Sequence, residues 1–179
     1  AQTTLNYPHK EEELNRPDEA NFTLGLCLLE AAGTFGCKKL INTGSYWQYS
    51  QGPLPCSNSI YAATKNAFDQ LVNYYVLQRQ FVVISLVLTD VYGPNDHRGK
   101  VLNELIRHDQ MGQDFEVTSG GQKINFVHID DVVDAYVLST QDGFDLRSGV
   151  HNQYFVAHQE SIELKKTLGL LHELMRSSI

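Results

Sequence analysis

The stretch FVVISLVL at positions 81–88 constrains the fold more than any other part of the sequence. This run is apolar except for one serine, and it is far shorter than the ~20 residues that cross a bilayer. A short, continuous apolar run rich in Val and Ile predicts a strand that is buried on both faces. Such strands lie at the centre of parallel sheets whose two faces are covered by helices.

The residues before this strand alternate between helical and extended patterns. The predicted elements are a helix from near Pro17 to Gly33 or Gly36, a strand at 38–44, a loop at 45–58 and a helix at about 59–78. The first helix has an apolar stripe formed by Leu24, Cys27, Leu28 and Ala31. The second is expected to start at a cap provided by Ser57, Asn58 or Ser59. This order predicts half of a doubly wound α/β sheet.

The second half of the chain has shorter elements. Residues 91–96 are predicted to form a turn. Helices are expected at 101–110, 130–139 and 161–175, and strands at 115–119, 124–129 and 152–157. We therefore expect a Rossmann-like parallel sheet together with a smaller α/β part.

Composition excludes several functional classes. The net charge is −7 and no basic run is present, which argues against nucleic acid as a partner. No apolar run is long enough for a membrane span. We expect Cys27, Cys37 and Cys56 to be free buried thiols in a reducing cytoplasm. The histidines show no metal-ligand spacing, and His128 with Asp130 and Asp131 is better explained as a strand end followed by a helix start; we therefore expect no metal site.

Three polar residues near the first strand suggest proton chemistry. Ser45 follows the strand at 38–44, and the carboxyl ends of strands in open α/β sheets face the ligand crevice. Tyr61 and Lys65, in YAATK, lie four residues apart on one helix face. Tyrosine has a pKa of ~10, and lowering it by ~3 units requires roughly 4 kcal/mol of preference for phenolate. A nearby ammonium can supply that preference.

In this order, Ser45, Tyr61 and Lys65 resemble the catalytic triad of the short-chain dehydrogenase/reductases. Other stretches resemble the extended, nucleotide-sugar branch, the NAD-dependent epimerase/dehydratase family. These stretches are ANFTLGLCLLEAAGTFGCKKLINTGS (20–45), LTDVYGP (88–94) and GGQKINFVHIDDVVDAYV (120–137). Within it, INTGSYWQY and DVYGPNDHRGK most resemble the CDP-4-keto-6-deoxyhexose reductases, the abequose and paratose synthase group.

The resemblance implies an enzyme that uses NAD or NADP to reduce a 4-keto-6-deoxyhexose linked to a nucleotide. Tyr61 would be the general acid, Ser45 would bond the carbonyl oxygen, Lys65 would bind the nicotinamide ribose and lower the pKa of Tyr61, and Asn21 would support a proton relay. Thr43 would line the nicotinamide side. Asp90 stands where the family has a substrate-binding residue. From the residues alone, Tyr46 and Trp47 are expected either to stack on the sugar or base of the substrate or to pack within their loop, and Arg98 either to contact the diphosphate or to belong to a solvated turn. Alternatives are a nucleotide-sugar 4-epimerase and a non-catalytic NAD(P)-binding module.

The resemblance also implies a domain division and a homodimer. Residues 1–94 would form the C-terminal half of the dinucleotide-binding domain, 95–130 the substrate-binding part, 131–157 a return to the sheet and 158–179 a final helix of the substrate-binding part. The helix at 59–78 would belong to the dimer interface. The sequence departs from the family in lacking a glycine-rich phosphate loop after a strand, since Gly33 and Gly36 follow a helix. We therefore expect the N-terminal βα units and the C-terminal end of the family fold to be missing from this chain.

Overall fold

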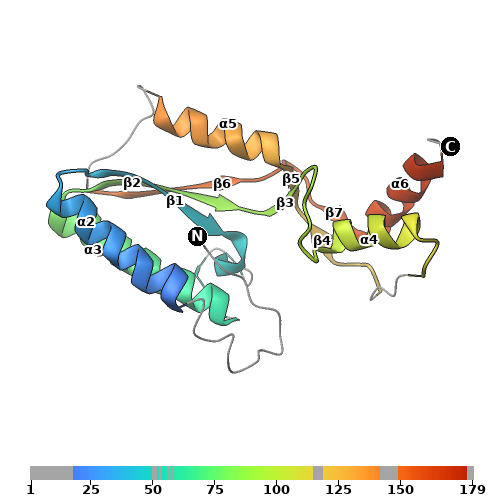
Figure 1. The fold of residues 1–179 in the computed structure, drawn as a ribbon, viewed down its shortest axis with the longest axis horizontal. Helices are drawn as coiled ribbons and strands as arrows, with labels where there is room; N and C mark the ends of the chain where they lie inside the picture. The colour runs from blue at the N-terminus through green and yellow to red at the C-terminus, as the bar shows by residue number, and fades with distance from the viewer. Residues whose placement is uncertain are drawn as a thin grey trace. The chain divides into compact units, whose positions relative to one another are not determined.

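The computed structural model describes most of the chain, and the chain divides into two compact units (Figure 1). Unit 1 comprises residues within 1–88 and 135–155, and unit 2 comprises residues within 89–134 and 156–179. The residues that the structure describes are 18–49, 52, 54, 55, 57, 59–114, 119–141 and 149–176. Each unit is described by itself below.

Unit 1 is built on a sheet in which β2 (Val82–Leu88) lies between β1 (Lys39–Ser45) and β6 (His151–Val156). β1 and β2 are parallel, in a register that runs from Lys39 opposite Val82 to Ser45 opposite Leu88. Residues 83–87 of β2 are all buried, so both faces of this strand are covered. The predicted central, doubly buried strand is therefore confirmed.

Helices cover both faces of this sheet. α2 (Leu24–Thr34) and α3 (Ile60–Arg79) pack on one face, and residues 135–140 at the end of α5 (Ile129–Thr140) lie on the other (Figure 1). The core between α2, α3 and the sheet is apolar; its buried members are Leu29, Val72, Tyr75, Val76, Phe81 and Val83. Helices on both faces of a parallel pair confirm the predicted α/β class.

The ends of α3 are set by local chemistry. Of the three predicted caps, the structure uses Ser59, whose hydroxyl accepts the Ala62 N–H at 3.1 Å. At the other end Gln80 adopts a left-handed conformation with φ of 57°, which terminates the helix before β2. α3 is thus delimited at both ends.

The predicted apolar stripe of α2 is wrong. Leu24, Cys27, Leu28 and Ala31 are not buried, and Leu28 is 57% accessible. The buried positions are instead Gly25 and Leu29, because α2 approaches α3 closely enough for Gly25 to contact the ring of Phe68. The expectation of buried thiols is also wrong, since Cys27 and Cys37 are free but exposed. Cys56 and the predicted helix start near Pro17 lie outside the described residues.

Unit 2 contains two short strand pairs and the helices α4 and α6. β3 (Asp90–Tyr92) pairs in parallel with β5 (Phe126–His128), and β4 (Lys123–Ile124) pairs antiparallel with β7 (Ile162–Glu163). α4 spans Val101–Gln110 as predicted, and α6 spans Leu164–Arg176.

Three predictions for unit 2 need correction. Positions 91 and 92 belong to β3 rather than to a turn, and positions 162 and 163 form β7 before the final helix begins at Leu164. The single strand expected at 124–129 is divided at Asn125. Its amide donates to His158 O at 2.8 Å and accepts from His158 N at 2.9 Å. Asn125 therefore holds the segment after β6 through hydrogen bonds. The strand expected at 115–119 lies almost entirely on residues 115–118, which are outside the described residues.

In the part of the chain that the structure covers, every helix is too short or too polar to cross a lipid bilayer.

The contact of Gly25 with Phe68 leads to a stability prediction. A Cβ at position 25 would lie 2.3 Å from Phe68 Cε2, so Gly25→Ala forces the ring to move. We expect a loss of about 1–3 kcal/mol in the free energy of unfolding, although alanine is normally favoured over glycine inside a helix by ~1 kcal/mol. The measurement is urea-induced unfolding.

Gly33→Ala is the matched control in the same helix. A Cβ there would lie 3.6 Å from Phe81 Cζ, which is an ordinary contact distance. We expect this variant to be as stable as the original protein or more stable by up to ~1 kcal/mol. Equal effects of the two substitutions would contradict the packing described for α2.

Candidate active site

The residues predicted for proton chemistry meet at the carboxyl end of β1. Ser45 is the last residue of β1, and Tyr61 and Lys65 lie on the first two turns of α3. The Ser45 side chain lies near enough to the Tyr61 phenol to lower its pKa as a hydrogen-bonding partner. The structure therefore brings together the three residues that the sequence suggested.

Lys65 is buried, at 2% exposure, although its ammonium group is charged. Its Nζ donates to the carbonyl oxygen of Thr43 at 2.6 Å and lies 5.8 Å from the centre of the Tyr61 ring. Burial lowers the pKa of Lys65 to about 8, and the negative charge of Asp69 acts in the opposite direction. At neutral pH Lys65 is therefore still protonated, but its ammonium group loses the proton more easily than that of an exposed lysine.

Tyr61 differs from the expectation. Burial raises its pKa above 10, and the hydrogen bond with Ser45 opposes this only in part. The sequence argument expected Lys65 to lower the pKa of Tyr61. In the structure the ammonium group is directed to the Thr43 carbonyl. Desolvation of the phenol is the larger effect here.

Two buried residues that the sequence analysis missed support this site. Gln48, in the 3₁₀ turn Tyr46–Tyr49, accepts the Ser45 N–H through Oε1 at 2.9 Å. Its Nε2 donates to Asp69 Oδ2 at 2.7 Å. Gly44 makes room for this arrangement, because a Cβ there would lie 3.3 Å from Gln48 Oε1. The sequence contained one signal: Asp69 is a charged residue on the same helix face as the apolar Val72 and Val76.

Asn21 is held next to α3. It lies in the π-helical turn Asp18–Thr23 and is 3% exposed. Its Nδ2 donates to Thr64 Oγ1 at 3.2 Å, and Thr64 in turn donates to the carbonyl of Tyr61. Within the described residues, Asn21 Oδ1 is a buried acceptor without a hydrogen-bond partner. Such an acceptor is costly to bury and is available to a hydroxyl or amide donor.

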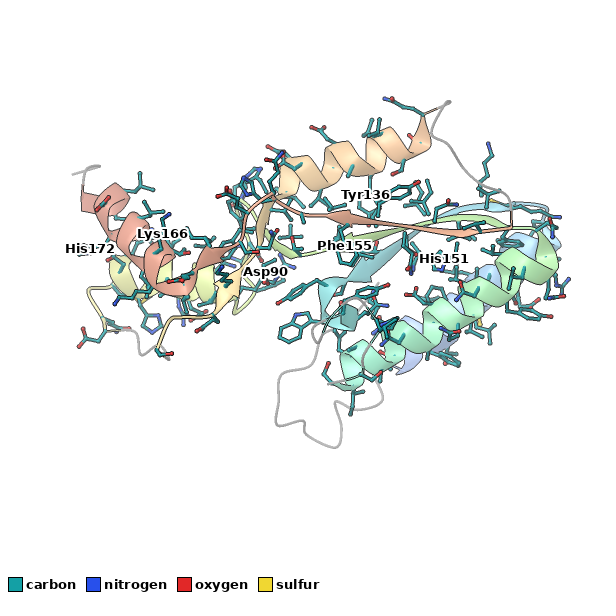
Figure 2. All side chains as sticks on the ribbon, turned by 180° about the vertical axis from the view of Figure 1, so that it is seen from behind. Asp90, Tyr136, His151, Phe155, Lys166 and His172 are labelled. Carbon is teal, nitrogen blue, oxygen red and sulfur yellow. The ribbon has the colours of Figure 1, made fainter. Side chains whose placement is uncertain are left out.

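The other predicted residues of unit 1 lie close to Ser45 in the chain. Trp47 is 45% exposed, and its ring centre lies 5.2 Å from that of Tyr46. The backbone N–H of Trp47 donates to Ser45 Oγ at 3.4 Å. Thr43 contributes its carbonyl to Lys65, while its hydroxyl is hydrogen-bonded to Tyr136 of α5. Figure 2 shows Tyr136 on the sheet-facing side of α5. The backbone of the exposed Trp47 thus contacts the serine hydroxyl, and its ring packs against Tyr46.

Asp90 and Arg98 belong to unit 2, and each is paired there. Asp90, in β3, lies 3.3 Å from Lys100 Nζ. Arg98 binds Asp96 through two contacts of 2.7 Å, and this guanidinium group holds the pKa of Asp96 well below its usual range. A substrate phosphate at Arg98 would therefore have to compete with a bidentate carboxylate.

A second polar chain in unit 1 has the residue types of a hydrolase triad. Ser85 Oγ lies 2.6 Å from His151 Nε2, and His151 Nδ1 lies 3.0 Å from Asn73 Oδ1. Ser85 is 0% exposed at the centre of β2, so a substrate cannot reach it. Burial also lowers the pKa of His151 to about 4. We interpret this chain as a structural link between β2, β6 and α3.

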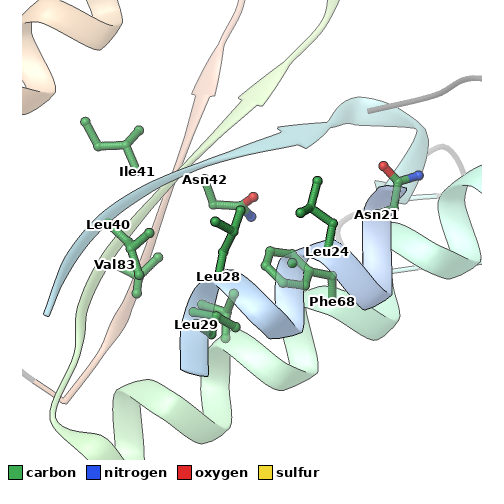
Figure 3. Close-up of a pocket in the computed structure, with 11 residues that line it drawn as sticks. Asn21, Leu24, Leu28, Leu29, Leu40, Ile41, Asn42, Phe68 and Val83 are labelled. Atoms are coloured by element: carbon green, nitrogen blue, oxygen red, sulfur yellow. The ribbon is translucent and has the colours of Figure 1, made fainter. Parts of the chain in front are cut away.

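A pocket lies between the helices and the sheet of unit 1 and includes Asn21 in its lining (Figure 3). It is formed by α2, α3, β1 and β2, and apolar side chains such as Leu28, Leu40 and Phe68 dominate its lining. Asn21 and Asn42 are its two amide-bearing residues, whereas Ser45, Tyr61 and Lys65 are not among the lining residues. The described residues contain no group of three or more His, Cys, Asp or Glu that could hold a metal ion.

The sequence and the fold identify the class of protein to which this chain belongs. Residues 4–152 match the sequence profile of the "NAD dependent epimerase/dehydratase family", and the chain belongs to this family. The resemblance inferred from the motifs is therefore confirmed.

Individual relatives narrow the comparison. The CDP-abequose synthase of Yersinia pseudotuberculosis is 30% identical over 133 residues, which are 70% of this chain and 45% of that protein. The CDP-abequose synthase of Salmonella muenchen is 30% identical over 174 residues, which are 97% of this chain and 58% of that protein. The chain thus spans about half the length of these curated relatives.

Solved structures agree in fold. The UDP-glucuronic acid 4-epimerase of Bacillus cereus, in complex with NAD, superposes with a TM-score of 0.84 and 19% identity over 94% of this chain and 56% of that chain. The UDP-glucose 4-epimerase of Thermus thermophilus, also with NAD, gives a TM-score of 0.75 and 24% identity over 90% of this chain and 56% of that one. At these identities the similarity shows the fold alone.

The residues of unit 1 fit one end of a dinucleotide. The Tyr61 hydroxyl, the Lys65 ammonium and the unpaired Asn21 oxygen provide donors and an acceptor of the kind that ribose hydroxyls require. Gly33 and Gly36 do not fit a pyrophosphate. They lie at the C-terminal end of α2, where carbonyl oxygens rather than N–H groups are exposed.

The burial of Lys65 predicts an unusual dependence of stability on pH. Its pKa is about 8 in the folded protein, below the 10.5 of an exposed lysine, so the unfolded chain binds more protons in this range. We expect the free energy of unfolding to rise by roughly 2–3 kcal/mol between pH 8 and pH 10. Denaturant titrations across this range measure the change.

Lys65→Met should remove this rise, because it removes the titrating group. Lys166→Met is the control, since Lys166 is an exposed residue of α6 (Figure 2) and its loss should leave the rise intact. A Lys65→Met variant with the original pH dependence would contradict the description of Lys65 as a buried lysine with a lowered pKa.

Proposed function

We propose that the protein is an NAD(P)-dependent oxidoreductase that reduces a nucleotide-linked 4-keto-6-deoxyhexose. The placement of the Ser45 side chain next to Tyr61, with the buried ammonium of Lys65 5.8 Å from the tyrosine ring, is the observation on which this proposal rests. Family membership and the similarity to two CDP-abequose synthases support the substrate class. These similarities favour reduction over 4-epimerization, which the same tyrosine would also allow.

In this proposal, Tyr61 donates its phenolic proton to the developing alkoxide at C4 of the sugar. Ser45 hydrogen-bonds the same oxygen and so aligns the carbonyl with the tyrosine hydroxyl. Because Tyr61 has a raised pKa in this structure, it holds its proton until negative charge develops on the substrate oxygen. A general acid placed in this way acts in the direction of reduction.

A nicotinamide cofactor supplies the hydride when it is bound. Lys65 and Tyr61 would bind its ribose hydroxyls, Thr43 would line the nicotinamide side, and Asn21 would support a proton relay beside them. The Lys65 charge would also stabilise the phenolate left after proton transfer. These residues do not distinguish NAD from NADP, which share the ribose and nicotinamide.

The remaining predicted site residues are proposed to contact the sugar nucleotide. We propose that Tyr46 and Trp47 stack on it, and the exposure of Trp47 supports this role. Asp90 and Arg98 are proposed substrate contacts from unit 2, which would act as the substrate-binding part while unit 1 binds the cofactor.

Assembly and location are proposed with support from surface features. We propose a homodimer that forms through α3, and the exposed Tyr74 and Leu77 of that helix support this proposal. We also propose a cytoplasmic location. The free, exposed Cys27 and Cys37 are consistent with a reducing compartment.

The direct test is reduction of CDP-4-keto-6-deoxyglucose by the full-length protein, followed through the absorbance of NADPH or NADH. We expect Tyr61→Phe to lower kcat by at least ~10²-fold, because the proton donor is lost while the ring remains. Tyr74→Phe is the control on an exposed face of the same helix; it keeps the ring available to the proposed dimer interface and should retain full activity.

Each alternative has its own result in this assay. Interconversion of UDP-hexoses without net change in nicotinamide absorbance would support the 4-epimerase. Cofactor binding without turnover, with wild type and Tyr61→Phe equally inert across nucleotide sugars, would support the non-catalytic module. Either result would refute the reductase.

The rate should also depend on the charge of Lys65. Its pKa of about 8 predicts that kcat falls as the pH rises above about 8, because the neutral amine no longer stabilises the phenolate. A pH profile of the reduction measures this alkaline limb. A rate that stays constant up to pH 10 would contradict a role for the ammonium group.

A further inference from the structure

Asp69 is a buried carboxylate on the sheet-facing side of α3, one turn beyond Lys65, and is 8% exposed. Its Oδ2 accepts from Gln48 Nε2 at 2.7 Å and from Gln153 Nε2 at 3.3 Å, and its Oδ1 accepts from Asn42 Nδ2 at 3.3 Å. A buried carboxylate is tolerated only when donors of this kind surround it. Asp69 thus connects α3 with β1, β6 and the turn that contains Gln48.

Gln48 transmits this arrangement to Ser45. The two ends of an amide differ, since the nitrogen donates and the oxygen accepts. Asp69 can only accept when ionised, so Gln48 must direct its Nε2 towards α3. Its Oε1 is then left to receive the Ser45 N–H at 2.9 Å. The carboxylate therefore determines how the chain turns at the end of β1, where the Ser45 hydroxyl meets Tyr61.

Asp69 also acts on Lys65 through charge. The two side chains are four residues apart on α3, and the carboxylate favours the ammonium form against the effect of burial. Other titratable groups near the pair are Tyr61 on α3, Tyr49 in the 3₁₀ turn, and His151 of β6, which reaches Asn42 through Ser85. Among these, Asp69 is the group whose charge opposes that of Lys65 at neutral pH.

We propose that Asp69 is a positioning residue of the active site, which fixes Ser45 through Gln48 and retains the Lys65 ammonium through its own charge. This inference rests on the proposed function for its kinetic consequences. It assigns two separable effects to one carboxylate, and each effect has its own readout.

Three variants separate the two effects in the reduction assay. Gln48→Leu breaks the link to Ser45 but leaves both charges, so kcat should fall at least ~10-fold with the alkaline limb unchanged. Asp69→Asn should lower kcat similarly and also move the alkaline limb down by roughly one pH unit. The double variant Gln48→Glu/Asp69→Asn restores a matched acceptor and donor with the opposite polarity. It should recover kcat to within ~3-fold of the original protein, and the limb should rise again because a carboxylate is restored to the same hydrogen-bonded pair.

Gln153→Leu is the matched control. It removes one hydrogen bond from Asp69 without touching Gln48 or Ser45, and we expect both kcat and the limb to be unchanged. Circular dichroism establishes that each variant is folded, and Gln48→Leu tests the link to Ser45 if Asp69→Asn does not fold. The proposal fails if Asp69→Asn keeps the original kcat and limb. It also fails if Asp69→Asn lowers kcat without moving the alkaline limb and the double variant does not recover kcat.

Two measurements on the full-length protein do not need activity. Hydrogen exchange of the Ser45 amide should be faster in Gln48→Leu and Asp69→Asn than in Gln153→Leu. An NMR titration of the Lys65 side chain should give a lower pKa in Asp69→Asn. If the original protein is inert towards every sugar, the proposed function fails, and these two measurements still decide the role of Asp69. Unchanged exchange and an unchanged titration would overturn it.

Discussion

A charged lysine buried beneath the end of a strand is the constraint on which the rest of the site depends. Lys65 is almost inaccessible, and its ammonium reaches Thr43 O at 2.6 Å. An ammonium in such a place requires an acceptor and a nearby negative charge, or it loses its proton. The Thr43 carbonyl provides the first and Asp69 the second. Asp69 in turn needs donors, which brings Gln48, Asn42 and Gln153 into the same layer.

This polar layer works because the parallel sheet fixes where its members stand. The register of β1 against β2 places Asn42 opposite Ser85 and Ser45 opposite Leu88. Asn42 Nδ2 can therefore contact both Asp69 and Ser85 Oγ, at 3.3 Å and 3.0 Å. A shift of one residue would direct Asn42 to the other face of the sheet and leave Asp69 with fewer donors. The hydrophobic run of β2 thus positions the candidate site, although none of its residues belongs to it.

The sequence was informative where a function depends on residues close in the chain. The pairing of Tyr61 with Lys65 follows from helical spacing, and Ser45 follows from its place at a strand end. Gln48 and Asp69 could not be recognised in the same way, because an amide or carboxylate shows its partner only when the turn and the helix meet. The apolar stripe of α2 failed for a similar reason. Gly25 has no side chain to mark a buried face, yet its missing Cβ is what allows the ring of Phe68 to approach.

Two serines in unit 1 show why residue type alone does not define a catalytic group. Ser85 has a histidine at 2.6 Å and an asparagine beyond it, which is a more familiar catalytic set than the partners of Ser45. However, Ser85 lies in the middle of the central strand β2, whereas Ser45 lies at the carboxyl end of β1, next to the turn that contains the exposed Trp47. In an open α/β sheet that end is where ligands bind. Position at the strand end, more than hydrogen-bond geometry, therefore makes Ser45 the candidate, and Ser85 and His151 are interpreted as links that hold the sheet to α3.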